Sequence, residues 1–166
     1  MTSSVLIRVI RGCLVCLLLG AVGGVLRASE IEFVRIWPAW RETESFIRIS
    51  EYFGGMEDTG RQTVLRTHAD ARSGFYFLTR TANAGTAVSG AKFELKVILP
   101  DSPYPRLFTF PVDIPAKGHV FNLGLTGDDW PDKKIQPVAW RLRLLTADGT
   151  ELAVGKSFLW DKPDGQ

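Results

Sequence analysis

The densest group of carboxylates in the sequence is the run Asp-Asp-Trp-Pro-Asp at residues 128–132. Calcium binds several carboxylate and carbonyl oxygens of one loop, so these aspartates could ligate it. The spacing of an EF-hand loop is absent, however, and Lys133 and Lys134 offset part of the negative charge. The alternative is a solvated turn whose aspartates accept hydrogen bonds from nearby backbone N–H groups. The sequence favours the turn, and it predicts no metal site.

Trp130 lies inside this polar loop and is the tryptophan that the sequence predicts to be exposed. An exposed indole offers a flat platform for a sugar ring. The sequence nevertheless favours a second interpretation, in which Trp130 packs over one end of the fold, where loops cover the core. The candidate ligand-binding residues are therefore Trp130, Asp128, Asp129 and Asp132. On this hypothesis we expect Trp130→Ala to fold normally and to lose ligand binding.

The residue patterns of common hydrolases and metalloproteases are absent. The sequence has no G-x-S-x-G and no H-E-x-x-H pattern, and its two histidines are His68 and His119. A turn in which His68 bonds Asp70 is favoured over a catalytic or metal-binding role, because two histidines alone seldom complete a site. Pairs of acidic residues of the kind that glycosidases use occur in any chain with this many acids and carry little information. The sequence predicts no catalytic residue and no cofactor.

Residues 1–29 have the layout of a secretory signal peptide. A short basic stretch precedes an apolar run at residues 12–26, and the small residues Ala28 and Ser29 follow it. The run is shorter than the roughly 20 apolar residues that a membrane-spanning helix needs. We therefore expect cleavage near Ala28 and Ser29 and export to the periplasm or the extracellular space. The alternative is an uncleaved anchor, because Arg27 lies close to the expected cut.

The expected leader also changes the cysteine content and the charge. Cys13 and Cys16 both lie within it, so the exported chain would have no cysteine and no disulfide. The formal net charge of +2 includes three leader arginines, and without them the chain is close to neutral. Affinity for nucleic acid comes largely from clustered Lys and Arg, and no such cluster remains. The sequence predicts no nucleic-acid partner and no membrane span after cleavage.

Residues 30–166 have the length of a single domain, and most of them follow strand patterns. The clearest strand is residues 92–99, where apolar and charged side chains alternate. Asp148-Gly149 between two such runs predicts a hairpin turn. We expect strands at residues 31–37, 63–67, 74–81, 92–99, 107–112, 119–126, 138–144, 152–154 and 157–160.

One segment changes period. Phe46, Ile49 and Phe53 recur at spacings of three and four, which predicts one short amphipathic helix over residues 42–53. Two glycines follow and favour a helix end, because glycine adopts the left-handed cap without strain. Three prolines in residues 100–105 predict an irregular connection.

About eight short strands separated by turns predict an antiparallel β-sandwich, with a barrel as the alternative. The patterns of residues 36–81 (IWPAW, SFIRISEYFGG, TVLRTH, GFYFLTRT) and 121–160 (FNLGLTGDDWP, PVAWRLRLLTADG, SFLW) resemble small exported bacterial proteins with an immunoglobulin-like β-sandwich and no assigned activity. The resemblance implies an all-β, antiparallel immunoglobulin-like sandwich of about 7–8 strands with one short helix near the start of the exported chain. It carries no motif of known chemistry and transfers no functional residue.

These observations favour an exported, non-enzymatic binding or interaction module with an unknown protein or carbohydrate partner. Its working surface would be the loops at one end of the sandwich, or an exposed strand edge that pairs with a partner. One alternative is a small secreted hydrolase of glycan or peptide, which would need a concave pocket holding acids or His68. The other is a structural accessory subunit of a cell-surface complex, which would need an exposed apolar patch.

Overall fold

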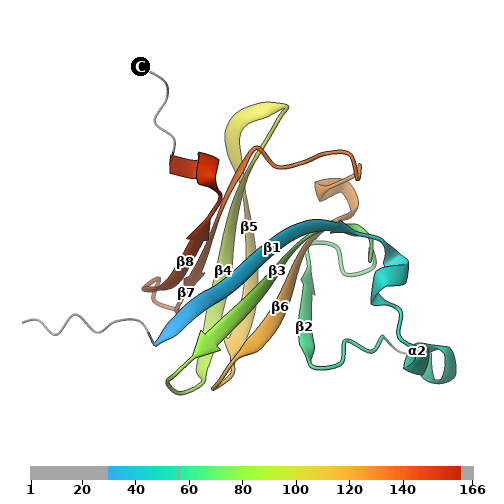
Figure 1. Ribbon diagram of the computed structural model, residues 1–166, viewed down its shortest axis with the longest axis horizontal. Coiled ribbons are helices and arrows are strands. Elements are labelled where there is room, and N and C mark those ends of the chain that lie inside the picture. Colours follow the sequence, from blue (N-terminus) through green and yellow to red (C-terminus); the bar gives the residue numbers. More distant parts are fainter. Residues whose placement is uncertain (1–29, 56, 162–166) are drawn as a thin grey trace, which may run out of the picture.

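Two β-sheets packed face to face form the protein (Figure 1). The computed structural model describes residues 30–55 and 57–161, so the expected leader and its two cysteines lie outside the described residues. Sheet A contains, in order, β1 (Ile31–Arg41), β3 (Gly74–Asn83), β6 (His119–Thr126) and β2 (Gln62–Arg66). Sheet B contains, in order, β5 (Ser102–Ile114), β4 (Val88–Leu99), β7 (Ala139–Leu145) and β8 (Glu151–Lys156). Four short helical segments complete the described chain: η1 (Thr43–Phe46), α2 (Ile49–Gly54), η2 (Gly127–Asp129) and η3 (Phe158–Asp161).

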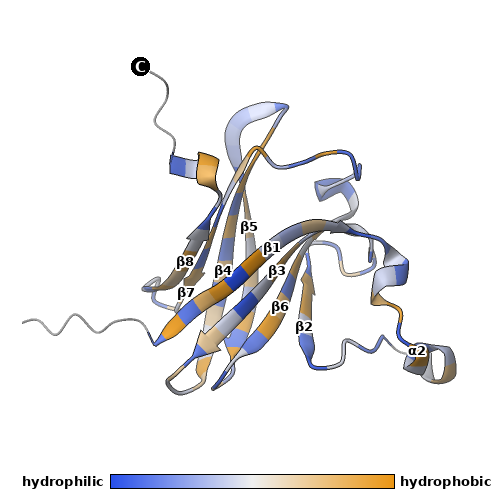
Figure 2. Ribbon diagram, in the orientation of Figure 1, coloured by the Kyte–Doolittle hydropathy of each residue, from blue (hydrophilic) through white to orange (hydrophobic). Residues whose placement is uncertain are grey.

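The core lies between the sheets and is built from alternate residues of their central strands. Figure 2 shows apolar and polar residues following one another along these strands, as a sheet with one buried face requires. The rings of Phe93 in sheet B and Phe121 in sheet A meet at a centroid distance of 5.1 Å. Phe77 and Trp140 make a second contact between the sheets at 5.5 Å. The predicted alternation of residues 92–99 is confirmed, because their apolar members are buried: Phe93, Leu95, Val97 and Leu99.

The predicted β-sandwich of about eight strands is confirmed, but the expectation that it is antiparallel throughout is wrong. β2 pairs with β6 in parallel, whereas the other strand pairs are antiparallel. β1 and β2 therefore run in the same direction, and a tight hairpin does not join parallel strands. Residues 42–61 instead cross the outer face of sheet A, where the rings of Phe46 and Tyr76 are 4.7 Å apart. We call residues 42–61 the crossover.

The single helix predicted over residues 42–53 is two shorter pieces, η1 and α2. Ile47 and Arg48 are extended, with ψ angles of 124° and 156°, and they separate the two pieces. Phe46 packs on the sheet, but Ile49 and Phe53, expected on the buried side, are 78 % and 88 % exposed. Gly55 caps α2 with a φ of 68°, which confirms the predicted glycine stop.

A register shift in β1 decides which of its side chains enter the core. The pairing with β3 is irregular between Phe33 and Arg35. Phe33 packs against the core before the shift, and Ile36 and Trp40 do so after it. Because one extra residue moves all later side chains to the opposite face, Trp37 lies outside and is 52 % exposed.

Prolines mark the free edge of sheet B. Residues 100–105 were expected to be an irregular connection, but β5 already begins at Ser102 and contains Pro103, Pro105 and Pro111. β5 is an edge strand, the position in a sheet where prolines are tolerated, because one side of the strand has no neighbouring strand to bond. At the end of the described chain, the predicted strand at residues 157–160 is largely the 3-10 turn η3.

Among residues 30–55 and 57–161, the helices are too short to cross a membrane.

Gly124 in β6 leaves room for the ring of Tyr76 in the adjacent strand β3. A Cβ at Gly124 would lie 2.4 Å from Cε1 of Tyr76, which is 1 % exposed. We expect Gly124→Ala to lower the free energy of unfolding by about 1–3 kcal/mol, because extra volume in a packed site forces side chains to shift. Gly54→Ala is the control, since a Cβ there meets nothing within 4 Å, and we expect it to change stability by less than about 1 kcal/mol. Urea unfolding would measure both, and equal effects would contradict the packing argument.

Candidate functional site

The residues predicted from sequence as a ligand site follow β6, at the end of the sandwich. Trp130 is 2 % exposed and stacks on Phe75 with ring centroids 4.6 Å apart. Its backbone N–H donates to the carbonyl of Gly127 at 3.1 Å, closing η2. Trp130 is therefore not the exposed tryptophan, and the favoured interpretation, that it packs over the end of the sandwich, is confirmed. The physical reason is that β6 and β7 belong to different sheets, so their connection must cover the core between them.

A cavity of about 610 Å³ lies beside this tryptophan. One wall is the connection after β6, and the other is the turn between β4 and β5. We call this cavity the end groove. Its lining residues are Leu99, Pro100, Asp101, Arg106, Asp128, Asp129, Trp130, Pro131, Lys134, Ile135 and Gln136. The structure thus brings Asp128, Asp129 and Trp130 together at one groove, whereas Asp132 is not part of its lining.

The carboxylates of this loop have separate partners. Asp129 Oδ2 lies 3.3 Å from His68 Nε2, so the partner of His68 is Asp129 rather than the expected Asp70. Asp132 accepts a hydrogen bond from the backbone N–H of Lys134 at 2.9 Å, as predicted for a turn aspartate. Asp128 is exposed and takes part in none of the ion pairs of the described residues. Within residues 30–55 and 57–161, no three His, Cys, Asp or Glu side chains are placed to hold a metal ion.

The two histidines do not share a cleft. His119 is the first residue of β6, and its Nε2 lies 2.9 Å from Thr63 Oγ1. His68 is held at the other end of the same strand, where its backbone N–H donates to Thr126 Oγ1 at 3.0 Å. An eight-residue strand is about 25 Å long, so one substrate bond does not reach both rings.

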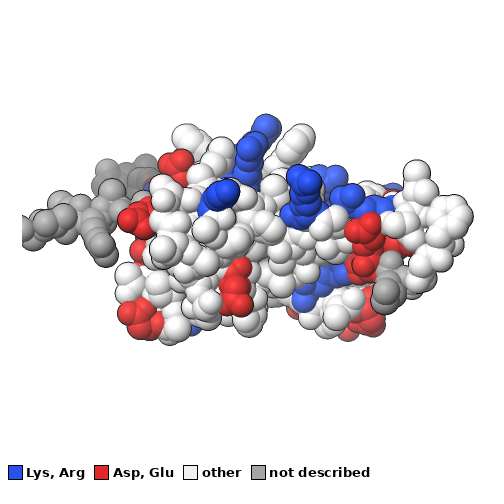
Figure 3. All heavy atoms as spheres, turned by 90° about the horizontal axis from the view of Figure 1, so that it is seen from below, with Lys and Arg blue, Asp and Glu red and all other residues white. Residues whose placement is uncertain are grey.

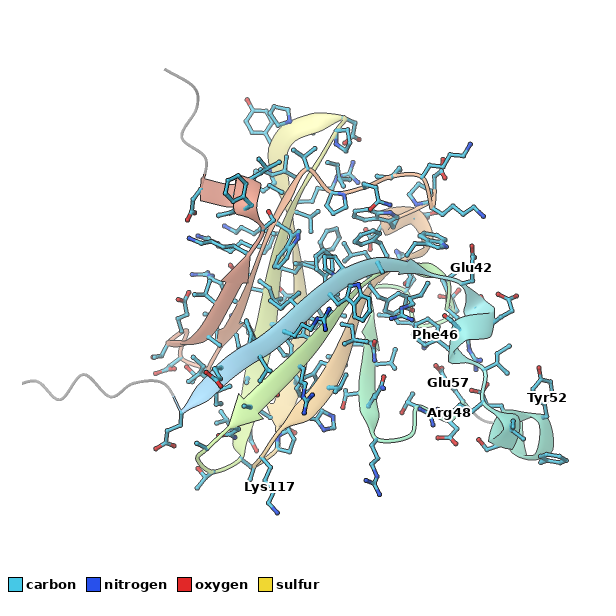
Figure 4. The ribbon with its side chains drawn as sticks, viewed as in Figure 1. Glu42, Phe46, Arg48, Tyr52, Glu57 and Lys117 are labelled. Carbon is cyan, nitrogen blue, oxygen red and sulfur yellow. The ribbon has the colours of Figure 1, made fainter. Side chains whose placement is uncertain are left out.

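A second cavity, of about 290 Å³, lies between the crossover and the outer face of sheet A. We call it the crossover pocket. Figure 4 shows Phe46, Arg48 and Glu57 in the crossover, between α2 and the sheet. The complete lining is Arg41, Ser45, Phe46, Arg48, Glu57, Asp58, Thr59, Gln62, Val64, Leu78 and Asn122.

A network of ion pairs fixes the crossover to sheet A. The guanidinium of Arg66, 7 % exposed, forms a two-bonded pair with Glu57 and donates from Nε to Tyr76 Oη at 2.9 Å. Arg72 Nη1 donates to Glu51 Oε2 at 2.8 Å. The hydrogen bond from Arg66 holds the pKa of Glu57 below its ordinary value, and the hydrogen bond from Arg72 does the same for the pKa of Glu51. Burial raises the pKa of Tyr76.

Sequence reasoning missed this network and the crossover pocket. Their residues come from five segments of the chain, and single arginines and glutamates give no local pattern. One signal was available: Arg66 lies in the predicted strand at residues 63–67, and Arg72 lies between it and the predicted buried strand that contains Tyr76. That signal does not identify the glutamates that pair with these arginines. The pairing depends on the crossover, which places β2 parallel to β6.

Comparison with family models and with curated proteins gives no relative on which a function could rest. No protein-family model matches the chain, and no curated protein matches it significantly. The conclusions about function therefore rest on the geometry of the two cavities.

Proposed function

We propose that this protein is an exported, non-enzymatic binding module that holds a segment of a protein partner in the end groove. The observation that supports this most directly is the groove itself, with a volume of about 610 Å³. Leu99, Trp130 and Ile135 supply apolar lining, while Asp128 and Lys134 are exposed charges beside it. Concave sites of roughly 300–1,000 Å³ with apolar walls and a few polar groups are typical of ligand pockets.

The burial of Trp130 favours a protein partner over a carbohydrate at this groove. A sugar ring would need the open face of an indole, but Phe75 stacks on Trp130 and only 2 % of the residue is exposed. An apolar side chain of a partner needs only a shaped apolar recess, which Leu99, Pro100 and Ile135 provide. Export to the periplasm or the extracellular space stays part of this proposal and rests on the expected leader. So does the immunoglobulin-like character of the sandwich, which rests on the resemblance.

The alternative of a structural accessory subunit of a cell-surface complex is favoured by one observation. Ile49, Tyr52 and Phe53 of α2 are 77–88 % exposed, which is unusual for large apolar side chains. Figure 1 shows α2 projecting from the sheets. The hydrolase alternative gains no comparable support, because His68 and His119 lie at opposite ends of β6.

A charge-reversal experiment tests the end groove as the binding site. Peptides selected from a random heptapeptide library on the immobilised protein would be titrated by calorimetry. We expect Asp128→Lys to weaken binding more than about tenfold, since a new cation beside the groove repels the basic side chains that Asp128 selects. Asp132→Lys makes the same charge change in the same loop outside the lining, and we expect a loss below about threefold. Equal effects of the two variants would show that the selected peptides bind elsewhere and would overturn the proposal.

A further inference from the structure

We propose that the crossover pocket, together with the exposed Trp37 beside it, binds an acidic saccharide. The pocket lies on the outer face of sheet A and shares no lining residue with the end groove. The inference is therefore independent of the proposed function, and either site can fail its test without affecting the other.

Two guanidinium groups of the pocket are available to a ligand carboxylate. Among the described residues, Arg41 and Arg48 take part in no ion pair. Arg48 is held in place, because its guanidinium rests on the backbone of Gly60, where a Cβ would lie 2.7 Å from Arg48 Cζ. Guanidinium groups bind carboxylates through two parallel hydrogen bonds, so this pair suits an organic acid.

The two carboxylates that line the pocket form no ion pair with Arg41. Glu57 is paired with Arg66, a residue outside the lining. Asp58 accepts hydrogen bonds from Ser50 Oγ at 2.5 Å and from the backbone N–H of Gly60 at 2.8 Å. Glu57 therefore has a cation of its own, whereas Asp58 also interacts with Arg48: the hydrogen bonds from Ser50 and Gly60 and, to a smaller extent, the charge of Arg48 lower the pKa of Asp58. The positive charge that is left for a ligand is chiefly that of Arg41.

The remaining lining fits a hydroxylated ring better than a bare anion. Asn122, 3 % exposed, donates to Gln62 Oε1 at 2.8 Å, so the amide of Gln62 is held at the pocket. Ser45 and Thr59 add hydroxyl groups, and Phe46, Val64 and Leu78 add apolar surface. Sugars carry hydroxyl groups around an apolar ring face, and this mixture of amides, hydroxyls and apolar carbon matches both.

Trp37 extends the site along one row of sheet A. It pairs with Leu78, and Leu78 pairs with Asn122, so all three lie on the same face of neighbouring strands. Adjacent strands are about 4.8 Å apart, which places the backbone of Trp37 about 10 Å from that of Asn122. The indole is 52 % exposed, and the guanidinium of Arg35 lies 4.7 Å from its ring centre. The sequence had named Trp130 as the exposed indole, with acidic neighbours, whereas the exposed indole here is Trp37 and its neighbour is a cation.

The surface around the row is positively charged. Arg35 and Arg80 are paired across β1 and β3 in the next row, and both are exposed. Figure 3 shows Lys and Arg side chains gathered mainly along its upper side, which faces the viewer in Figure 1. A polymer with repeated carboxylates would gain from this field, since each further acidic unit meets another cation.

Calorimetric titration tests the inference. The protein is expressed from the full chain and used as the expressing cells have processed it. The probe is a linear trisaccharide of galacturonic acid. The matched neutral probe is the galactose trisaccharide with the same linkage, and sodium sulfate is the simple anion. Variants are Arg41→Gln, Trp37→Ala and, as the control, Arg61→Gln. Arg61 is exposed and adjacent in sequence to Gln62, but it does not line the pocket, so its loss removes the same charge outside the site.

We expect the acidic trisaccharide to bind and the neutral one to bind at least about tenfold more weakly, as the loss of a charge-assisted contact implies. Arg41→Gln should weaken binding about tenfold and Trp37→Ala about fivefold, whereas Arg61→Gln should change it less than twofold. The inference is overturned if sulfate or the neutral trisaccharide binds as tightly as the acidic one, or if Arg61→Gln has the effect of Arg41→Gln. Absence of binding at about 10 mM trisaccharide would overturn it too.

Discussion

Trp130→Ala is expected to lower the free energy of unfolding by about 3–5 kcal/mol, the loss typical of removing a buried aromatic side chain. The side chain is 2 % exposed and stacks on Phe75, which is itself 1 % exposed. Its removal would leave a cavity where the connection after β6 covers the core. This replaces the expectation drawn from the sequence, that the variant folds normally, and it makes Trp130→Ala unsuitable as a test of ligand binding.

Chemical denaturation of matched variants would check this value. Trp37→Ala removes the same side chain at a position that is 52 % exposed, and we expect it to change the free energy of unfolding by less than about 1 kcal/mol. Trp130→Phe keeps an aromatic ring against Phe75 and should recover part of the loss. Equal stability of Trp130→Ala and Trp37→Ala would contradict the burial of Trp130. It would favour the earlier hypothesis that Trp130 is an exposed platform.

Arg66→Ala is expected to lower the free energy of unfolding by about 1–3 kcal/mol at neutral pH, because it removes the Nε hydrogen bond to the hydroxyl of the buried Tyr76. The ion pair contributes less, because Glu57, the partner, is exposed and is hydrated when left alone. The variant also loses the contact with the ring of Phe46. Arg106→Ala breaks an exposed pair with Asp101 and should cost less than about 1 kcal/mol.

The effect of Arg66→Ala should depend on pH in a defined direction. Arg66 holds the pKa of Glu57 below its ordinary value in the folded protein, so the pair stabilises the fold above about pH 4.3. This stability is lost as the pH falls through the lowered pKa of the folded state, because Glu57 is then protonated. The difference between the wild-type protein and Arg66→Ala should therefore shrink below about pH 4. Urea unfolding at pH 7 and at pH 3 would measure it, and a difference independent of pH would rule out the charge of Glu57 as the cause.

The two cavities differ in the kind of partner they suit because different chain connections form them. The end groove lies where the connection between the sheets passes the turn of β4 and β5, and its apolar lining continues the core: Leu99 and Trp130 belong to both. The crossover pocket lies on a solvent-facing side of sheet A, so its lining is polar and charged. A protein segment at the first and an acidic saccharide at the second would make the module a link between the two kinds of partner.

The sequence alone determined the class of fold and most of its strands. Alternation in residues 92–99 places Phe93, Leu95 and Val97 in the core, and Asp148-Gly149 marks the turn between β7 and β8, with Gly149 at a φ of 88°. These features are local, since the period of a strand and the positive φ of a turn act within a few residues. The loop at residues 128–132 was also identified from sequence as a place of interest, and four of its five residues line the end groove.

Only the tertiary structure decided which indole is exposed and where the cations lie. One irregular position between Phe33 and Arg35 turns Trp37 outward, and no alternation pattern reveals it. Trp130 is buried because its loop spans two sheets, although its neighbours in the sequence are polar. The parallel pairing of β2 with β6 brings Arg41, Gln62 and Asn122 to one pocket from three strands. Such contacts join residues far apart in the chain, so they follow from the path of the backbone in space and leave no local trace in the sequence.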